Sequence, residues 1–233
     1  MSAHANPDIV SDGLVLCLDA GDRKSYSGSG TTWTDRSGNE KNGTLANSPS
    51  YDSSYGGGIS FDGANDHITT SLDLSWNDTS DASVFVTVTP ASSQTRPIIG
   101  KGNSQWEWQI NQQGSGLQLV YWNTSGSHTN GPITTISNVF EANVTVSVGT
   151  VWNSSDNKHY FYKNGVQVGN NTWTDASINQ NRSNGVHLGG NIYQWGLGGN
   201  YWSGIIHNAT LYNKALTAAE VLQNYNATKS RFE

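Results

Sequence analysis

Short runs of apolar and aromatic residues, separated by clusters of Gly, Asn, Asp and Ser, recur along the whole chain. Each run has about the length of one strand, and turn-forming residues bound it on both sides. This pattern predicts a single all-β domain built from antiparallel strands. The strands are expected at residues 14–19, 59–61, 67–69, 83–89, 97–100, 105–110, 117–122, 143–151, 158–163, 166–168, 186–188 and 202–212.

The clearest local signal is a hairpin between Tyr160 and Val168. Its centre is Asn164-Gly165, and this dipeptide readily supplies the two positive φ angles that a type I′ turn requires. The flanks on both sides are rich in aromatic and β-branched residues, which favour strands. A two-residue turn is therefore expected at 164–165.

One short helix is predicted near the C-terminus, at 218–225. Thr217 can accept from backbone N–H groups of the first turn while Glu220 reaches back, which is the reciprocal capping box. Val221 and Tyr225 lie at helical spacing and give this helix one apolar side. The helix is expected to pack on the edge of the β-domain.

The chain is expected to divide into a polar arm, residues 1–12, and one domain, residues 13–233. The stretch 20–47 is dense in Gly, Ser, Asp and Thr, which indicates a long loop. Trp33 and Leu45 are its apolar anchors.

Composition supports this assignment and limits the partners. The chain has 26 Gly, 9 Trp, 10 Tyr and a net charge of -6. Without a cluster of Lys or Arg it lacks the attraction that nonspecific binding to nucleic acid or anionic membranes requires. The residues after Met1 show neither a basic start nor a long apolar stretch, so we expect no signal peptide, no membrane insertion and synthesis in a host cytoplasm. Cys17, the single cysteine, is expected to be a buried hydrophobe.

The carboxylates argue against catalysis. Retaining glycosidases need two carboxyl groups about 5 Å apart. Glu107 lies on a predicted strand, but neutral Gln105 and Gln109 occupy the alternate positions. The six histidines show no close metal spacing. We therefore expect a protein that is not an enzyme, with glycoside hydrolysis as the less favoured alternative.

The same strand predicts a binding face. Alternation places Trp106, Trp108 and Ile110 on one face, where core packing is favoured. The opposite face is expected to be solvent-facing, and it forms either a polar groove for a glycan or a plain solvated sheet. The residues expected along this groove are Gln105, Glu107, Gln109, Gln118 and Trp122.

A second candidate contact is the Gly-rich loop 189–200. Tyr193 and Trp195 have no obvious structural position in it. Amphipathic aromatic residues suit both a glycan and a subunit interface, so both readings stay open.

Five motifs in order resemble one known family, the laminin-G-like jelly rolls of the concanavalin A-like lectin and glucanase superfamily. They are Trp33-Thr-Asp35-Arg-Ser-Gly38-Asn39 with Gly43-Thr-Leu45, Ile59-Ser-Phe61-Asp62-Gly63-Ala-Asn65-Asp66-His67-Ile68, the strand 84–90, the hairpin 160–168, and the closing segment 204–220. The resemblance covers nearly the whole chain. It implies an antiparallel jelly-roll β-sandwich with one short C-terminal helix.

Calcium is the commonest cofactor of that family, held by loop carboxylates and carbonyls. The resemblance therefore makes Ca²⁺ a candidate ligand. The aspartates beside the motifs are Asp19, Asp22, Asp35, Asp62 and Asp66. The alternative is that Asp35, Asp62 and Asp66 order tight turns through hydrogen bonds to the backbone.

The opening segment 16–33 resembles laminin-G-like domains in the virion proteins of tailed phages, especially marine ones. The resemblance implies a virion surface protein that decorates the capsid or forms part of a head or tail fibre. Its partners would be other virion proteins and a host or environmental glycan. A homo-oligomer is expected, with a trimer favoured because virion sites often have threefold symmetry. A free carbohydrate-binding module is the alternative.

Overall fold

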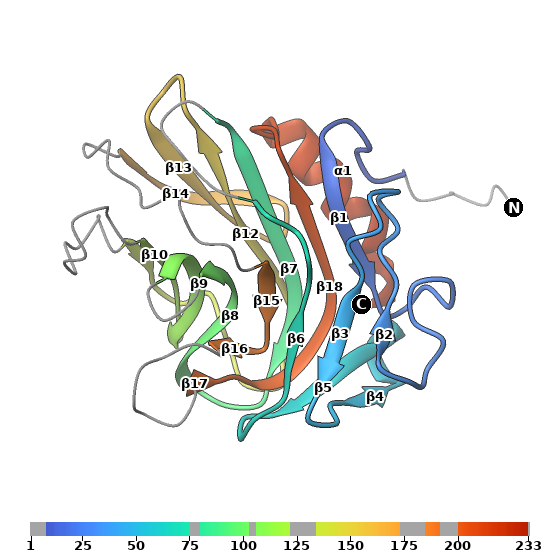
Figure 1. Cartoon of the computed structure of the whole chain (residues 1–233). Helices are drawn as coiled ribbons and strands as arrows, with labels where there is room; N and C mark the ends of the chain where they lie inside the picture. The colour runs from blue at the N-terminus through green and yellow to red at the C-terminus, as the bar shows by residue number, and fades with distance from the viewer. Residues whose placement is uncertain are drawn as a thin grey trace, which may run out of the picture.

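The computed structural model is a sandwich of two antiparallel sheets with a helix on the outside of one of them (Figure 1). The all-β sandwich and its single C-terminal helix are confirmed. The structure describes residues 8–74, 80–102, 106–121, 134–172, 185–191 and 200–232.

The first sheet, sheet A, has its longest strand, β18, near the centre. Residues 203–206 of β18 pair with β5 and residues 208–212 pair with β1, both on one side, while β7 lies along the other side. In spatial order the strands are β14 (Val166–Thr172), β13 (Lys158–Lys163), β12 (Val146–Asn153), β7 (Ala82–Pro90), β18 (Ser203–Tyr212), β5 (Gly58–Asp62) and β4 (Ser50–Asp52), with β1 (Leu14–Asp19) beside β18.

The second sheet, sheet B, faces sheet A across the core. In spatial order its strands are β11 (Thr134–Ile136), β10 (Gly116–Tyr121), β9 (Trp106–Gly114), β8 (Gln94–Gly102), β15 (Val186–Leu188), β6 (His67–Thr69), β3 (Gly43–Ala46) and β2 (Thr32–Trp33). A small separate ladder joins β16 (Gly190–Asn191) and β17 (Asn200–Tyr201). The loop expected at 20–47 thus contains two short strands, β3 and the edge strand β2, and its anchors Trp33 and Leu45 are both buried.

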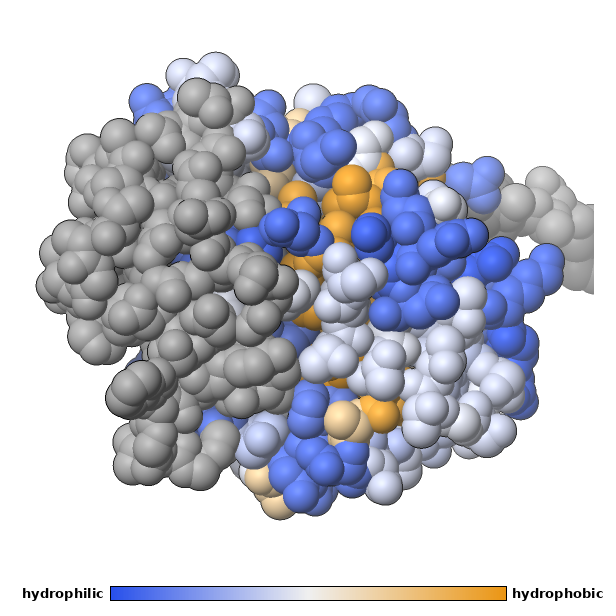
Figure 2. All heavy atoms as spheres, viewed as in Figure 1, coloured by the Kyte–Doolittle hydropathy of each residue, from blue (hydrophilic) through white to orange (hydrophobic). Residues whose placement is uncertain are grey.

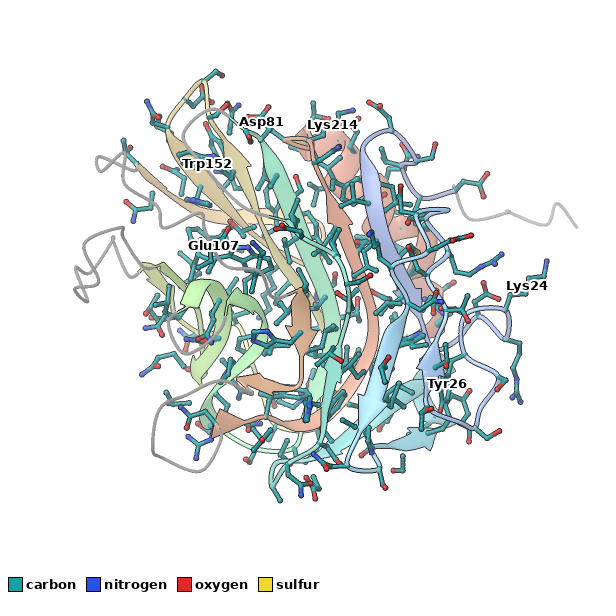
Figure 3. All side chains as sticks on the ribbon, viewed as in Figure 1. Lys24, Tyr26, Asp81, Glu107, Trp152 and Lys214 are labelled. Atoms are coloured by element: carbon teal, nitrogen blue, oxygen red, sulfur yellow. The ribbon has the colours of Figure 1, made fainter. Side chains whose placement is uncertain are left out.

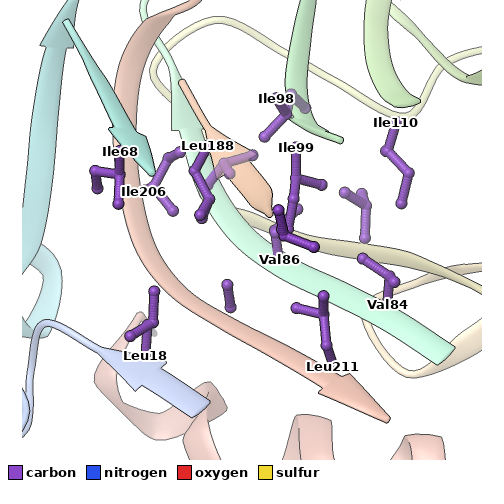
Figure 4. Close-up of a cluster of buried hydrophobic side chains, with 14 of the residues drawn as sticks. Leu18, Ile68, Val84, Val86, Ile98, Ile99, Ile110, Leu188, Ile206 and Leu211 are labelled. Carbon is purple, nitrogen blue, oxygen red and sulfur yellow. The ribbon is translucent and has the colours of Figure 1, made fainter. Parts of the chain in front are cut away.

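The core lies between the two sheets (Figure 4). Alternate residues of β7, such as Val84 and Val86, meet residues of sheet B such as Ile99 and Ile110, and all four are buried. Burying one aliphatic side chain of this size stabilises a fold by about 1.5–3 kcal/mol. The period of two in these strands therefore sets which face of each sheet turns inward.

Helix α1 (Ala218–Thr228), followed by the short 3-10 turn η2 (Lys229–Arg231), covers part of the outer face of sheet A. The capping box is present, since Thr217 accepts from the Glu220 N–H and Glu220 accepts from the Thr217 N–H. Val221 is the buried residue of the helix. The N-terminal segment reaches the same helix, because Val10 N–H donates to Asn224 Oδ1 at 2.8 Å.

The predicted hairpin turn is also confirmed. Asn164 has φ of 50° and Gly165 has φ of 77°, in the left-handed region that a type I′ turn uses. A second 3-10 turn, η1 (Ser54–Gly56), precedes β5. Among the described residues no helix is long and apolar enough to cross a membrane. Figure 2 shows mostly blue and white atoms on the side that carries β1–β5, with orange atoms near the centre of the view and a few at its lower edge.

Candidate binding face

A buried ion network lies at one end of strands β8 and β9. The Lys101 ammonium is 2.6 Å from Glu107 Oε2 and 2.7 Å from Asp73 Oδ1. Lys101 and Glu107 are both 0% exposed, and Glu107 lies between the two sheets (Figure 3). The prediction that Glu107 faces solvent is therefore wrong. Its carboxylate is engaged by Lys101 and cannot reach a ligand on the surface.

A β-bulge explains this reversal. Lys101 lies opposite Trp108, but the next residue of β8, Gly102, lies opposite Trp106. Glu107 is thus an extra residue in β9 that has no paired residue in β8. A bulge interrupts the alternation of side chains and re-aims one of them. Glu107 consequently turns to the side of its neighbour Trp108, which is in the core.

Gln109 keeps its predicted place on the outer face of sheet B, but it is 1% exposed. The prediction that it faces solvent is therefore also wrong. It lies beside Gly100 of β8, where an added Cβ would come within 2.8 Å of the Gln109 side chain. Its Nε2 finds no hydrogen-bond partner within the described part of the chain. Gln109 is thus buried behind the accessible part of this face.

The accessible part of the outer face is a row of amides and a hydroxyl across β9, β10 and β11. Asn111 lies opposite Gln118, and Gln118 lies opposite Thr135. Asn111 Nδ2 donates to Gln118 Oε1 at 3.2 Å, and Gln118 Nε2 donates to Thr135 Oγ1 at 3.4 Å. We call Asn111, Gln118 and Thr135 the amide face. Its groups hold one another in position and keep hydrogen-bonding capacity for a ligand.

Part of this face is predictable from the sequence. Gln118 lies on it as predicted, whereas Asn111 and Thr135 were missed. Asn111 continues the alternation of Glu107 and Gln109, so the period of two was the available signal. The other predicted members of the groove and loop fall outside the described residues: Gln105, Trp122, Tyr193 and Trp195.

Three of the candidate metal ligands order turns. Asp35 is buried and accepts from the backbone N–H groups of Cys17, Ser37 and Lys41 at 2.8–3.0 Å. Asp62 accepts from the Ala64 N–H at 2.8 Å, and that bond lowers the pKa of Asp62.

Asp66 closes the same turn by accepting from the Asp62 N–H at 3.1 Å, while burial raises the pKa of Asp66. The two remaining aspartates are in ion pairs: Asp19 lies 2.7 Å from Arg231, and Asp22 lies 3.2 Å from Arg36. Within the described ranges, no three His, Cys, Asp or Glu side chains form a group that could hold a metal ion. The five candidate aspartates therefore do not converge.

Burial also governs the other titratable groups. It lowers the pKa of His159 to about 3 and that of His187 to about 4, so both rings are neutral. Cys17 is buried as predicted, and desolvation with the nearby Asp19 and Asp35 raises the pKa of its thiol to about 12. These groups are built into the fold and are not prepared for acid–base chemistry.

Two antiparallel sheets packed face to face define a β-sandwich. Residues 62–222 match the family model described as the concanavalin A-like lectin/glucanases superfamily. The chain belongs to this superfamily. No curated protein sequence matches it.

Solved structures share the fold at low sequence identity. The receptor-binding domain of botulinum neurotoxin type G is 14% identical with a TM-score of 0.64, over 92% of this chain and 51% of that chain. Domain 4 of AbnA, a GH43 extracellular arabinanase from Geobacillus stearothermophilus in complex with arabinotriose, is 16% identical with a TM-score of 0.63, over 91% and 98%. Trypanosoma rangeli sialidase in complex with sialic acid is 14% identical with a TM-score of 0.64, over 94% and 33%. This chain thus spans about half of the neurotoxin chain and nearly all of the arabinanase domain.

Proposed function

We propose that this protein is a non-catalytic carbohydrate-binding module and that the amide face is its glycan contact. The observation that carries the proposal is the row of Asn111, Gln118 and Thr135, aligned across three strands and joined by hydrogen bonds. Amide and hydroxyl groups both donate and accept, which matches the hydroxyls of a sugar. Two structural relatives carry sugars, arabinotriose and sialic acid.

The absence of catalysis is part of the proposal. Glycoside hydrolysis by two carboxylates requires both to reach the scissile bond. In the sequence, Glu107 is the carboxylate residue closest to Asn111 of the amide face. Its side chain is wholly buried against Lys101. The three residues of the amide face are uncharged. This arrangement favours recognition of a neutral glycan over its cleavage.

The setting that we propose is the surface of a virion, either as a capsid decoration or as part of a head or tail fibre. It is supported by the resemblance of segment 16–33 to phage virion domains. Its partners would be other virion proteins, and the module would be a symmetric oligomer, with a trimer as the working expectation. Mass spectrometry of purified virions should detect the chain, and its absence from them would exclude this setting.

The glycan contact is tested by screening the full chain on a glycan array and measuring the best hit by calorimetry. Asn111→Ala and Gln118→Ala should each weaken binding about five- to tenfold, the effect of one lost hydrogen bond. The matched control is Gln167→Ala, because Gln167 is an exposed glutamine on β14 of the other sheet. Equal binding by all four proteins, or an array without any hit, would refute the proposed contact.

A further inference from the structure

A cleft separates the second half of α1 from the outer face of sheet A. It has a volume of about 180 Å³, and hydroxyl groups of Thr87, Thr145 and Ser147 line it. The rings of Tyr225 and Phe232 form part of its wall. A smaller space of about 40 Å³ continues from it under the helix and shares Thr87, Ser147 and Tyr225. The amide face is on the other sheet, so this cleft is a separate feature.

The floor of the cleft is a polar row in register across four strands. Asp19 of β1 lies beside Asn208 of β18, Asn208 lies beside Thr87 of β7, and Thr87 lies beside Ser147 of β12. Thr87 is 3% exposed and Asn208 is 8% exposed. The helix therefore shields a row of polar side chains from bulk water instead of covering it with apolar ones.

The apolar contact of the helix is made one row further along the strands. Val221 of α1 packs in a cluster with Phe85 of β7 and Tyr162 of β13. This contact holds the first half of α1 against the sheet. The second half of α1 therefore lies above the polar row without an apolar contact of this kind. The cleft is thus a consequence of where the helix buries its single apolar anchor.

A chain of hydrogen bonds determines that the Thr145 hydroxyl donates to Thr89. His207 Nδ1 is 2.8 Å from the Gly57 carbonyl, which can only accept, so Nδ1 carries the proton. Burial lowers the pKa of His207, so the ring is neutral and its Nε2 accepts from the Thr89 hydroxyl at 2.8 Å. Thr89 in turn accepts from the Thr145 hydroxyl at 2.7 Å. The hydrogen of Thr145 is used, and its oxygen remains as an acceptor toward the cleft.

A donor lies further inside. Asn208 Nδ2 is buried and has no hydrogen-bond partner among the residues that the structure describes. The larger part of the cleft carries a single formal charge on its described lining, Lys229, whose ammonium lies 5.9 Å from the centre of the Tyr225 ring. Thr145 thus offers an acceptor to the cleft, and Asn208 offers a donor to the smaller space, where the charge of Asp19 is paired with Arg231.

We propose that this cleft is a second binding site, for a small neutral polyol no larger than a single sugar ring. Hydroxyl groups satisfy both an acceptor such as Thr145 and a donor such as Asn208. Drug-sized ligands fill about 300–1,000 Å³, which excludes an oligosaccharide from this space. The rings of Tyr225 and Phe232 supply an apolar wall for the carbon skeleton of the ligand.

The test is a titration of the full isotope-labelled chain with glycerol, glucose, galactose and mannose, followed by NMR. Binding of at least one of them should shift the backbone signals of β7, β12 and α1. Thr145→Val should weaken that binding about five- to tenfold, because it removes the oxygen and keeps the shape. Thr145→Ser should restore it. Thr145→Val also removes the hydrogen bond to Thr89 and should lower the thermal midpoint by a few degrees, so binding is measured well below the midpoint of every variant.

Thr135→Val on the amide face is the matched control and should leave the affinity of the cleft unchanged. In the same way, Thr145→Val should leave the binding of array glycans by the amide face unchanged, so the two proposals fail separately. No shift at β7, β12 and α1 with any of the four polyols would mean that the cleft holds water only, and the proposal would be refuted. Shifts that Thr145→Val does not weaken would refute it as well.

Discussion

Lys101 and Glu107 form an ion pair of 2.6 Å in which both side chains are fully buried. They come from neighbouring strands at a bulge, and Asp73 shares the same ammonium at 2.7 Å. Removing two charges from water is costly, and the attraction between them offsets that cost only while both are present. The pair therefore fixes how β8 and β9 are arranged at the bulge.

Lys101→Met should be strongly destabilising, because it leaves the Glu107 carboxylate buried without its cation. We expect the free energy of unfolding to fall by about 3–5 kcal/mol, measured by urea denaturation. The double variant Lys101→Met with Glu107→Leu should lose less than the single one, since it removes both charges. A double variant that is no more stable than the single one would contradict this account.

The buried histidines should make the protein sensitive to acid. The ordinary pKa of His159 is 6.5 and burial lowers it to about 3, so the folded state binds fewer protons than the unfolded state. Stability is thus present above pH 6.5 and is lost as the pH falls from there toward 3. Between pH 7 and pH 5 this histidine should cost about 2 kcal/mol, measured by thermal and urea unfolding.

The control for this effect is His159→Gln, which keeps a polar group beside Thr150, whose hydroxyl lies 3.3 Å from His159 Nδ1. This variant should lose part of the pH dependence between pH 7 and pH 5, whatever its stability at neutral pH. An unchanged slope would show that His159 does not titrate on unfolding. His187, with a pKa lowered to about 4, should account for a similar share.

Cys17 should resist thiol reagents in the folded protein. It is 7% exposed, and the pKa of about 12 leaves almost no thiolate at neutral pH. Labelling with iodoacetamide, followed by mass spectrometry, should be complete in denaturant and negligible without it. Fast labelling of the native chain would show that the strand β1 opens readily from β18.

The cap of α1 can be tested by Thr217→Ala. This change removes the acceptor for the Glu220 N–H and should lower the free energy of unfolding by about 1 kcal/mol. Thr217→Ser keeps the hydroxyl and should have little effect. Equal losses in both variants would place the contribution of Thr217 in its methyl group instead of its hydroxyl.

The sequence predicted those elements whose cause is local. The Asn164-Gly165 turn and the Thr217–Glu220 box depend only on neighbouring residues, and the structure has both. The exposure of Glu107 was predicted wrongly, because the bulge that turns it inward is a relation between β8 and β9 that no local pattern records.

The polar row beneath α1 was equally hidden. Asp19, Asn208 and Thr87 come from three distant parts of the chain, and only the register of β1, β18 and β7 brings them together. The short strands β2 and β3 were missed for a different reason, since their Gly- and Ser-rich surroundings are typical of loops.

The position of β18 governs when the protein can fold. This strand separates β7 from β1 and β5, yet ribosomes synthesise it after all three. Leu14 pairs with Tyr212, which is synthesised nearly 200 residues later. Until then, the strands that become sheet A have unpaired edges. Pairings this remote in sequence slow folding and leave edges exposed to aggregation. Sheet A can therefore close only after β18 has left the ribosome, and the yield of folded protein should depend on chaperones and on the rate of synthesis.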